Sequence, residues 1–449
     1  DYPFAFELAK IYEAQGNITK VSESLVGMVD FGEEYLESVK NALSTYFTDA
    51  SGGKRRKVVE KVILSKIQNN PDNIGLSELL IWFYLQEKKF NAAFIHSKAL
   101  DKRSEGNGRE IIRLAKICVQ NKAYKVAVKS YQYVIDKGDN SVFYRKARLD
   151  LVEVLNNKLS EDPNSTFSDV EQLQKSYEQA LKDLGENAFT IDLMRGYAHM
   201  LAFHLGETEK AKNYLNKCIG LQRAKMTQRA KCKIELGDIY VVEDEVWEAV
   251  LLYGQVNQDF KEGEIGHEAK LKSAKAYYYT GEFEWAKAQL DVLKASTTKL
   301  ISNDAMQLSI LISDNLAMDT STVALKMYAQ ADLYAYQNND SMSLDYCDSI
   351  LAKFPKNATL LDDVFFLKAK IYSKNKQWEL AIENYKKAVE YQDLLKDDAL
   401  FAMGLIYDKI LNQPDKALSC FESIILEHED SIYSIEARKN FRRLRGDKI

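Results

Sequence analysis

The chain is poor in the two residues that most often interrupt helices. Its 449 residues include only 5 prolines and 20 glycines, and both shares are below those of typical soluble proteins. Because proline removes a backbone donor and glycine frees the backbone, this scarcity indicates long helices joined by short turns. Hydrophobic residues make up 46% and charged residues 28% of the chain, a balance that argues against intrinsic disorder.

Other absences argue against whole classes of protein. No stretch approaches about 18 uninterrupted apolar residues, so the sequence predicts no transmembrane helix. The formal net charge of -5 argues against nucleic-acid binding, which needs lysine and arginine to displace counterions. The five cysteines form no Cys-x-x-Cys pair, and we interpret them as small buried hydrophobic residues. A helical pattern is already under way at Phe4, so we expect the natural protein to continue upstream of Asp1.

Catalytic and cofactor-binding motifs are also missing. His199 and His204 are five positions apart, which does not place both on one helix face as a metalloprotease requires. The sequence has no zinc-type spacing, no phosphate-binding glycine loop and no nucleophile elbow. Two acidic pairs, Asp362-Asp363 and Asp397-Asp398, are expected at helix starts, where acids cap backbone N–H groups. We therefore predict no enzymatic activity, no catalytic residue, no cofactor and no metal.

The chain does contain a repeated pattern of small and large residues. In one copy, the small residue Gly237 is followed by Tyr240, Ala249 and Tyr253, and the next copy repeats this spacing from Ala274. Other copies begin at Ala9, Ala115, Ala331, Ala369 and Gly404, and weaker ones at Ile81 and His199. Small residues allow two antiparallel helices to approach, and the large residues fill the space between neighbouring pairs. One pair cannot bury its apolar face alone, so the copies must stack.

This pattern resembles the tetratricopeptide repeat family, whose repeat of about 34 residues has small residues, Tyr, Gly, Ala and Pro at these offsets. The resemblance implies an all-α fold, a right-handed superhelical α-solenoid of antiparallel helix pairs. Residues from about Ala324 to Arg445, with Phe354-Pro355 before a new pair, are also similar to repeat lipoproteins of bacterial outer-membrane assembly. The Lys-, Asn- and Tyr-rich chain as a whole is similar to exported repeat proteins of Bacteroidota-type bacteria. These similarities imply a periplasmic or outer-membrane-associated protein; the alternative is a cytoplasmic one.

The regularity of the repeats changes along the chain. We expect irregular repeats over residues 1–186, regular repeats over 187–434, and a basic capping helix over 435–449; one continuous superhelix is the alternative. Three stretches depart from the pattern. Glu33–Asn69 carries two helical segments, and Ser160–Asp169 is a polar hinge or exposed excursion. Thr297–Thr322 holds an extra helix, Leu300–Leu316, that should disturb the stacking.

The first helices of the pairs line the concave groove in this family, so register gives candidate partner-binding residues. Tyrosine suits such a surface because it offers apolar area and a hydroxyl together. Within Tyr277-Tyr278-Tyr279, we expect Tyr277 in the core and the other two in the groove. The candidates in the groove are Lys231, Asp238, Lys275, Tyr278, Tyr279, Asp332, Tyr336, Lys370 and Lys374.

The basic C-terminal helix provides a second candidate surface through Arg442 and Arg443. Its cations would bind an anion or an acidic partner, or would simply complement the helix C-terminus in solvent.

The expected function is a non-catalytic scaffold that binds a protein or peptide partner in its groove, in bacterial envelope assembly and in association with an outer-membrane complex. One alternative is a self-assembling structural protein. The other is a helical-toroid hydrolase, which would require a deep pocket lined by clustered carboxylates with perturbed pKa values.

Overall fold

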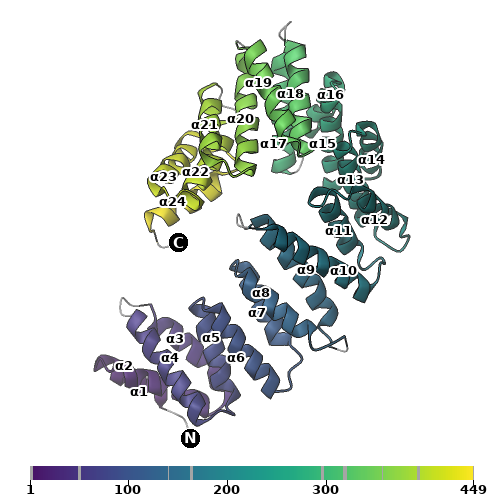
Figure 1. The fold of residues 1–449 in the computed structure, drawn as a ribbon. Coiled ribbons are helices and arrows are strands. Elements are labelled where there is room, and N and C mark those ends of the chain that lie inside the picture. The colour runs from purple at the N-terminus through teal and green to yellow at the C-terminus, as the bar shows by residue number, and fades with distance from the viewer. Residues whose placement is uncertain are drawn as a thin grey trace. The chain divides into compact units, whose positions relative to one another are not determined.

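Helices are the regular secondary structure of this protein. The computed structural model describes residues 4–48, 52–139, 141–161, 165–294, 298–316, 321–355, 357–391 and 395–447. Within these ranges there are 24 α-helices, two short 3-10 helices and no strand. The helices form two compact units, Asp1–Glu186 and Asn187–Ile449, each a stack of helices joined by short turns (Figure 1). The predicted all-α solenoid of helix pairs is confirmed.

The N-terminal unit contains ten α-helices, most of them paired with the next helix in the chain. α1 packs with α2, α5 with α6 and α7 with α8, while α4 packs against both α2 and α5. The irregular stretch between Glu33 and Asn69 forms two α-helices as predicted, preceded by two 3-10 turns. The bounds are α1 Ala5–Ala14, α2 Ile18–Gly27, η1 Met28–Asp30, η2 Glu33–Tyr35, α3 Leu36–Tyr46, α4 Gly52–Asn69, α5 Ile74–Gln86, α6 Phe90–Arg103, α7 Arg109–Gln120, α8 Tyr124–Ile135, α9 Tyr144–Glu161 and α10 Phe167–Leu184. Residues 162–164 of the predicted hinge lie outside the described residues.

The C-terminal unit contains fourteen α-helices. Twelve of these helices form six pairs: α11 with α12, α13 with α14, α15 with α16, α18 with α19, α20 with α21 and α22 with α23. The predicted extra helix, α17, stands between the third and the fourth pair, and α24 packs on the last pair. The bounds are α11 Ile191–Phe203, α12 Thr208–Gly220, α13 Met226–Val242, α14 Val246–Asp259, α15 Glu264–Tyr279, α16 Phe283–Leu293, α17 Lys299–Leu316, α18 Ser321–Tyr336, α19 Asp340–Lys353, α20 Ala358–Lys374, α21 Trp378–Tyr391, α22 Lys396–Lys409, α23 Pro414–Glu427 and α24 Ser434–Arg445.

The small residues of the repeat lie where the two helices of a pair approach closely. A Cβ atom on Gly237 would stand 2.6 Å from Cε1 of Tyr253, and one on Gly404 would stand 2.8 Å from Cε1 of Phe421. Glycine is therefore needed for these rings to lie against the first helix. Ala249, the small residue of the second helix, is fully buried. The predicted close approach of the helices at the small residues is confirmed, whereas the rings of Tyr253 and Phe421 lie against the first helix of their own pair and not only between neighbouring pairs.

One turn geometry recurs inside the pairs. A residue two or three positions after the end of the first helix takes a positive φ. This lets the following N–H reach a carbonyl in the last turn of that helix and ends it. Glu245 N–H donates to Tyr240 O at 2.8 Å, and Glu282 N–H donates to Tyr277 O at 2.9 Å. Glycine fills the positive-φ position in some pairs and a polar residue in others: Gly16, Lys88, Lys122, Gly206, Asp244, Gly281, Asn338 and Lys376.

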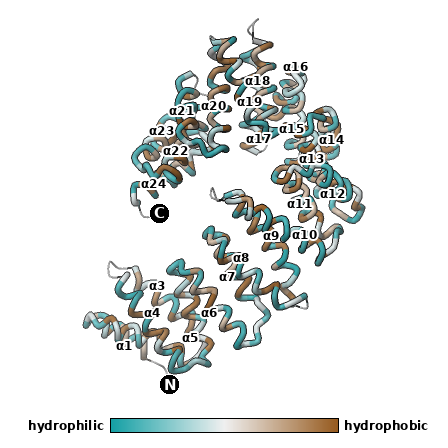
Figure 2. The backbone as a smooth tube through the Cα atoms, viewed as in Figure 1, coloured by the Kyte–Doolittle hydropathy of each residue, from teal (hydrophilic) through white to brown (hydrophobic). Residues whose placement is uncertain are grey.

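Apolar side chains are buried between neighbouring helices along each stack, and Figure 2 shows hydrophobic residues alternating with hydrophilic ones along the helices. One buried cluster extends from α15 to α20 and includes Ala305 and Ile312 of α17. This burial explains why α17 is held in the stack although it lacks the repeat pattern. The five cysteines are buried as predicted; burial raises the pKa of Cys118 to about 12, so its thiol is unreactive at neutral pH.

Candidate functional site

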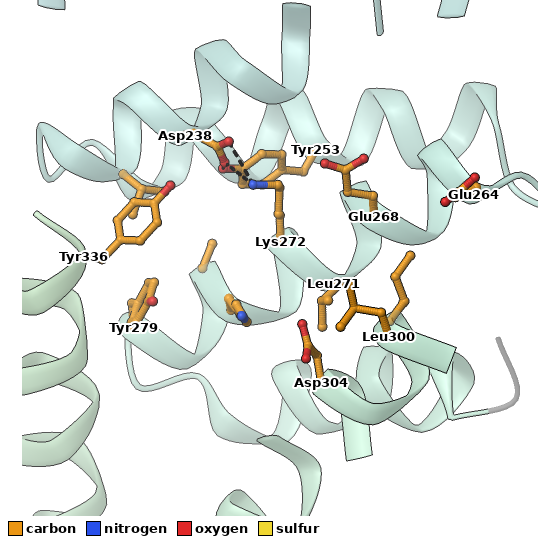
Figure 3. A pocket seen from close by; sticks show the side chains of 14 residues that line it. Asp238, Tyr253, Glu264, Glu268, Leu271, Lys272, Tyr279, Leu300, Asp304 and Tyr336 are labelled. Carbon is orange, nitrogen blue, oxygen red and sulfur yellow. Dashed lines mark hydrogen bonds and ion pairs between the residues drawn. The ribbon is translucent and has the colours of Figure 1, made fainter. Parts of the chain in front are cut away.

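A cavity of about 390 Å³ lies in the C-terminal unit, mainly on the first helices α13 and α15. α14, α17 and the last turn of α18 complete its wall (Figure 3). Its volume is within the range of about 300–1,000 Å³ that is usual for ligand sites. The lining residues are Asp238, Val241, Tyr253, Glu264, Glu268, Leu271, Lys272, Lys275, Ala276, Tyr279, Leu300, Ile301, Asp304 and Tyr336.

Asp238 is the centre of a hydrogen-bonded network at one end of the cavity. The Tyr253 hydroxyl donates to its Oδ1 at 2.7 Å, and Lys272 Nζ lies 2.9 Å from Oδ1 and 2.8 Å from Oδ2. Burial raises the pKa of the Asp238 carboxyl above its ordinary value, while Lys272 and Tyr253 act to lower it. These partners keep a half-buried carboxylate compatible with its apolar surroundings.

Two tyrosines form a second part of the wall. The ring centroids of Tyr279 and Tyr336 are 6.3 Å apart, and Asp332 accepts a hydrogen bond from Tyr279. Burial raises the pKa of both tyrosines, so the hydroxyl groups stay protonated at neutral pH. Next to them, Gln337 Nε2 donates to Val241 O at 3.1 Å and ties the end of α18 to the end of α13.

Three carboxylates in the cavity wall are unpaired. Glu264 and Glu268 come from α15 and Asp304 from α17, and Figure 3 shows no partner for any of them among the residues drawn. In the part of the chain that the structure describes, none forms an ion pair or a side-chain hydrogen bond. Since Asp238 is already neutralised by Lys272, these three acids face only Lys275 among the lining cations. The cavity therefore favours a positively charged group.

Four of the predicted groove residues line this one cavity: Asp238, Lys275, Tyr279 and Tyr336. Asp332 lies directly beside the cavity and accepts a hydrogen bond from Tyr279.

The other predicted binding residues lie elsewhere on the C-terminal unit. Lys231 and Lys370 are exposed and do not line the cavity. Lys374 Nζ is paired with Asp340 Oδ1 at 2.7 Å. On α24, Arg442 is exposed and Arg443 is paired with Asp408. A binding role for all these residues stays a prediction.

The predicted placement of Tyr278 in the groove is wrong. Tyr278 is only 1% exposed and packs on Phe283, with a ring centroid distance of 5.9 Å. The expected core residue, Tyr277, is only partly buried. Leu271, Ala274 and Tyr278 belong to the same buried cluster, and their spacing of three and four puts them on one helix face. The core stripe of α15 thus passes through Tyr278.

Several cavity residues escaped the sequence-based prediction. Glu268, Lys272, Lys275 and Tyr279 follow one another at spacings of four, three and four on one stripe of α15. Extending that stripe backwards from Lys275 would have found Glu268 and Lys272. Asp304 had no such signal, because α17 lies outside the repeat and its register against the groove cannot be counted.

The predicted position of the acidic pairs at helix starts holds for one pair only, and that helix has no side-chain cap hydrogen bond: Asp398 accepts from Tyr433 and Gln307 instead. Asp397 and Asp398 occupy the first turn of α22. Asp362 and Asp363 lie inside α20, because that helix begins four residues earlier, at Ala358. Burial raises the pKa of Asp362 to about 6 and also raises that of Asp363. Neither residue lines the cavity.

Among the described residues, no group of three or more His, Cys, Asp or Glu side chains is arranged to hold a metal ion. None of the described helices combines the length and apolar character needed to cross a bilayer.

The N-terminal unit has a larger concavity of about 1,050 Å³ between α3, α5, α6 and α7. Trp82 and Ile81 provide apolar surface there, while Glu78, Glu110 and Arg113 contribute charges of both signs. The sequence-based prediction proposed no site in this unit, because its repeats are irregular and the groove positions could not be counted from them.

Family models match single helix pairs of this chain, and solved repeat proteins match it at low sequence identity. Two tetratricopeptide repeat models match the chain, one at residues 398–431 and the other at 198–225 and 362–393. A tetratricopeptide repeat protein from Parabacteroides merdae is 15% identical, with 65% of this chain and 98% of that chain covered and a TM-score of 0.36. The C-terminal part of a repeat-containing protein from Cytophaga hutchinsonii is 14% identical, with 63% and 95% covered and a TM-score of 0.34. No curated protein matches the sequence.

The three matched segments coincide with α11–α12, α20–α21 and α22–α23, three of the helix pairs described above. Between them, the pairs that begin at α13, α15 and α18 carry the same pattern of small and large residues. The predicted resemblance to tetratricopeptide repeats is confirmed over these three helix pairs.

Proposed function

We propose that this protein is a non-catalytic scaffold that binds a segment of a partner protein in the cavity on α13, α15, α17 and α18. Stacked repeats of this family offer extended surfaces for protein partners. The cavity combines tyrosine rings, aliphatic side chains and charged groups in a concave surface, which is the composition of a site for a polypeptide.

The observation that carries the proposal is the set of three unpaired carboxylates, Glu264, Glu268 and Asp304. We infer that the bound segment inserts a lysine or arginine side chain among them. A cation there would gain two or three charge-assisted hydrogen bonds in partly desolvated surroundings. The aliphatic part of the side chain would lie against Leu271 and Tyr279, and Tyr279 also offers its ring to the charge.

Affinity capture from native cells with the full chain tests this proposal. The Glu264→Gln, Glu268→Gln, Asp304→Asn triple variant should lose the partner that the unaltered chain retains. A matched triple variant, Glu379→Gln, Glu422→Gln, Glu429→Gln, removes the same charge from exposed positions outside the cavity and should retain it. Equal recovery of the partner with both variants would rule out the cavity as the binding site.

We also propose that the protein acts in bacterial envelope assembly, in the periplasm or at the outer membrane in association with a complex there. The support is the similarity of residues from about Ala324 to Arg445 to envelope-assembly lipoproteins and of the whole chain to exported repeat proteins. Fractionation of cells that express the complete protein at its native level tests this location. Recovery in the cytoplasmic fraction alone would contradict it.

A further inference from the structure

Two tryptophans are exposed on the second helices of neighbouring pairs, away from the cavity. Trp247 on α14 is 55% exposed and Trp285 on α16 is 64% exposed. Each has an exposed aliphatic residue on the same helix face, Leu251 at 61% and Val292 at 61%, four and seven positions further on. These four residues are called the Trp face below. Large exposed apolar residues that share a face are typical of protein interfaces.

The two helices of the Trp face are linked through the end of α15. The Trp247 ring packs edge-on against Tyr277, with centroids 6.0 Å apart. The carbonyl of Tyr277 accepts a 2.9 Å hydrogen bond from the N–H of Glu282, the residue that precedes α16. Trp285 stands in the first turn of that helix. Both helices that carry the Trp face are therefore connected to the end of α15.

Carboxylates surround the Trp face. Five exposed acids lie at the starts of α14 and α16, and within the described ranges none of them forms an ion pair: Asp244, Glu245, Glu248, Glu282 and Glu284. Lys287 on α16 and Lys326, which approaches Gly281, are cations nearby. Acids at helix starts complement the helix dipole, but that role requires no tryptophan beside them. Aromatic rings next to carboxylates form a surface that suits arginine and lysine.

The same chain carries a surface of complementary character on α24. Ile435 is 83% exposed, and Arg438, Lys439 and Arg442 follow it on one face at spacings of three, four and seven. Where the chain is described, these three cations form no ion pair. α24 packs against α23 at the end of the stack through Ala437, Phe441 and Leu444, so its basic face points away from its own unit.

We propose that the Trp face of one molecule binds the α24 face of a second copy of this chain. Ile435 would pack against the tryptophan rings, while Arg438 and Arg442 would stack on these rings and pair with Glu248 and Glu284. The two faces differ, so the contact is heterologous; it produces a closed pair when both contacts form reciprocally and an open assembly when they do not. This interaction is independent of the proposed binding cavity.

Sedimentation velocity of the full chain over a wide concentration range tests the proposal. The unaltered chain should show concentration-dependent self-association, and Trp247→Ala, Trp285→Ala should weaken it about thirtyfold or more. Phe189→Ala is the matched control, because Phe189 is an aromatic residue that is 96% exposed and lies outside the Trp face. Circular dichroism of each variant checks that the fold is retained.

A charge exchange gives the sharper result. Two double variants are compared: Glu248→Lys with Glu284→Lys, and Arg438→Glu with Arg442→Glu. Each double variant tested alone should abolish self-association. Mixed in equal amounts, the two variants should associate again, because each reversed face then meets an opposite charge. A chain that stays monomeric at every concentration would overturn the proposal. So would association that all these variants leave unchanged, or a mixture of the two charge variants that fails to associate.

Discussion

Lys272 Nζ on α15 lies 2.8 Å and 2.9 Å from the two carboxylate oxygens of Asp238 on α13. The pair joins the first helices of two successive repeats at the wall of the cavity, and Tyr253 adds a third helix to it. Neither carboxylate oxygen is left without a partner, which is the condition for holding a carboxylate in a half-buried site. The same contacts fix the geometry of the cavity and contribute to the stability of the stack.

Replacing Lys272 with methionine should destabilise the protein. The change keeps most of the aliphatic stem but leaves Asp238 without its cation in a site where the carboxylate is 13% exposed. We expect the free energy of unfolding to fall by about 1–3 kcal/mol, measured by urea unfolding. Lys387→Met is the control, because its pair with Glu383 at 2.7 Å is exposed on both sides and should matter by less than about 0.5 kcal/mol. Equal effects of the two variants would contradict a special role for the Asp238 pair.

Two glycines of the same helix pair should respond in opposite ways to alanine. Gly237→Ala places a Cβ atom 2.6 Å from the ring of Tyr253, so the ring that holds Asp238 must move, and we expect a loss of about 1–3 kcal/mol. Gly254, inside α14, has no atom within 4 Å of its Cβ position. Gly254→Ala should therefore stabilise the helix by about 0.5–1 kcal/mol. Thermal unfolding compares the two, and a Gly237→Ala variant as stable as Gly254→Ala would contradict the packing described.

Tyr278 offers a direct test of its placement in the core. Its hydroxyl is buried without a hydrogen-bond partner in the described structure, so Tyr278→Phe should leave stability unchanged or raise it by about 1 kcal/mol. Tyr278→Ala should remove about 3–5 kcal/mol by opening a void between α15 and its neighbours. If Tyr278 were exposed in the groove, Tyr278→Ala would lower the free energy of unfolding only slightly. That result would support the original sequence-based placement.

Asp362 should make stability depend on pH in an unusual direction. Its folded pKa of about 6 lies above the unfolded value of about 3.9, so the folded state binds more protons between these values. Stability therefore falls as pH rises from about 4 to about 6 and beyond, because the ionised carboxylate is buried. Asp362→Asn removes this penalty and should raise the free energy of unfolding at pH 7 by an amount on the order of 2–3 kcal/mol.

The pH profile of Asp362→Asn distinguishes this mechanism from a general effect of substitution. The gain should shrink towards zero below about pH 4, where the carboxyl is protonated in both states. Asp430→Asn, a change at an exposed site, should alter stability little at either pH. A gain from Asp362→Asn that is the same at low and neutral pH would show that its ionisation is not the cause.

The sequence was sufficient to predict the helix pairs, because their packing depends on a local pattern that repeats. Gly237 illustrates this, since the spacing alone indicated a small residue where the two helices of a pair approach; that the Tyr253 ring lies against it is seen only in the structure. The pattern also located four of the fourteen residues of the cavity wall: Asp238, Lys275, Tyr279 and Tyr336. These residues occupy first-helix positions that can be counted from one repeat to the next.

The sequence-based prediction was wrong where it depended on the exact register of a helix or on the position of the first residue of a helix. Tyr278 and Tyr279 are adjacent, and an error of one residue in register, about 100° around the helix, exchanges the core face for another face. Asp362 was assigned to a helix start because the beginning of α20 was placed too late. Asp304 and Ile301 could not be anticipated, because their contribution depends on how a helix without repeat pattern packs against α15 and α18.

Site-specific photo-crosslinking in native cells tests the central claim, that the cavity binds a basic segment of a partner protein, most directly. A photoreactive amino acid at Leu300, in the cavity wall on α17, is compared with one at Leu426, which is 71% exposed and lies on α23 outside the cavity. We expect position 300 alone to crosslink to one protein, within a segment that contains lysine or arginine. The Glu264→Gln, Glu268→Gln, Asp304→Asn variant should abolish that crosslink. Crosslinks that are equal from both positions, or that survive the loss of the three carboxylates, would contradict the central claim.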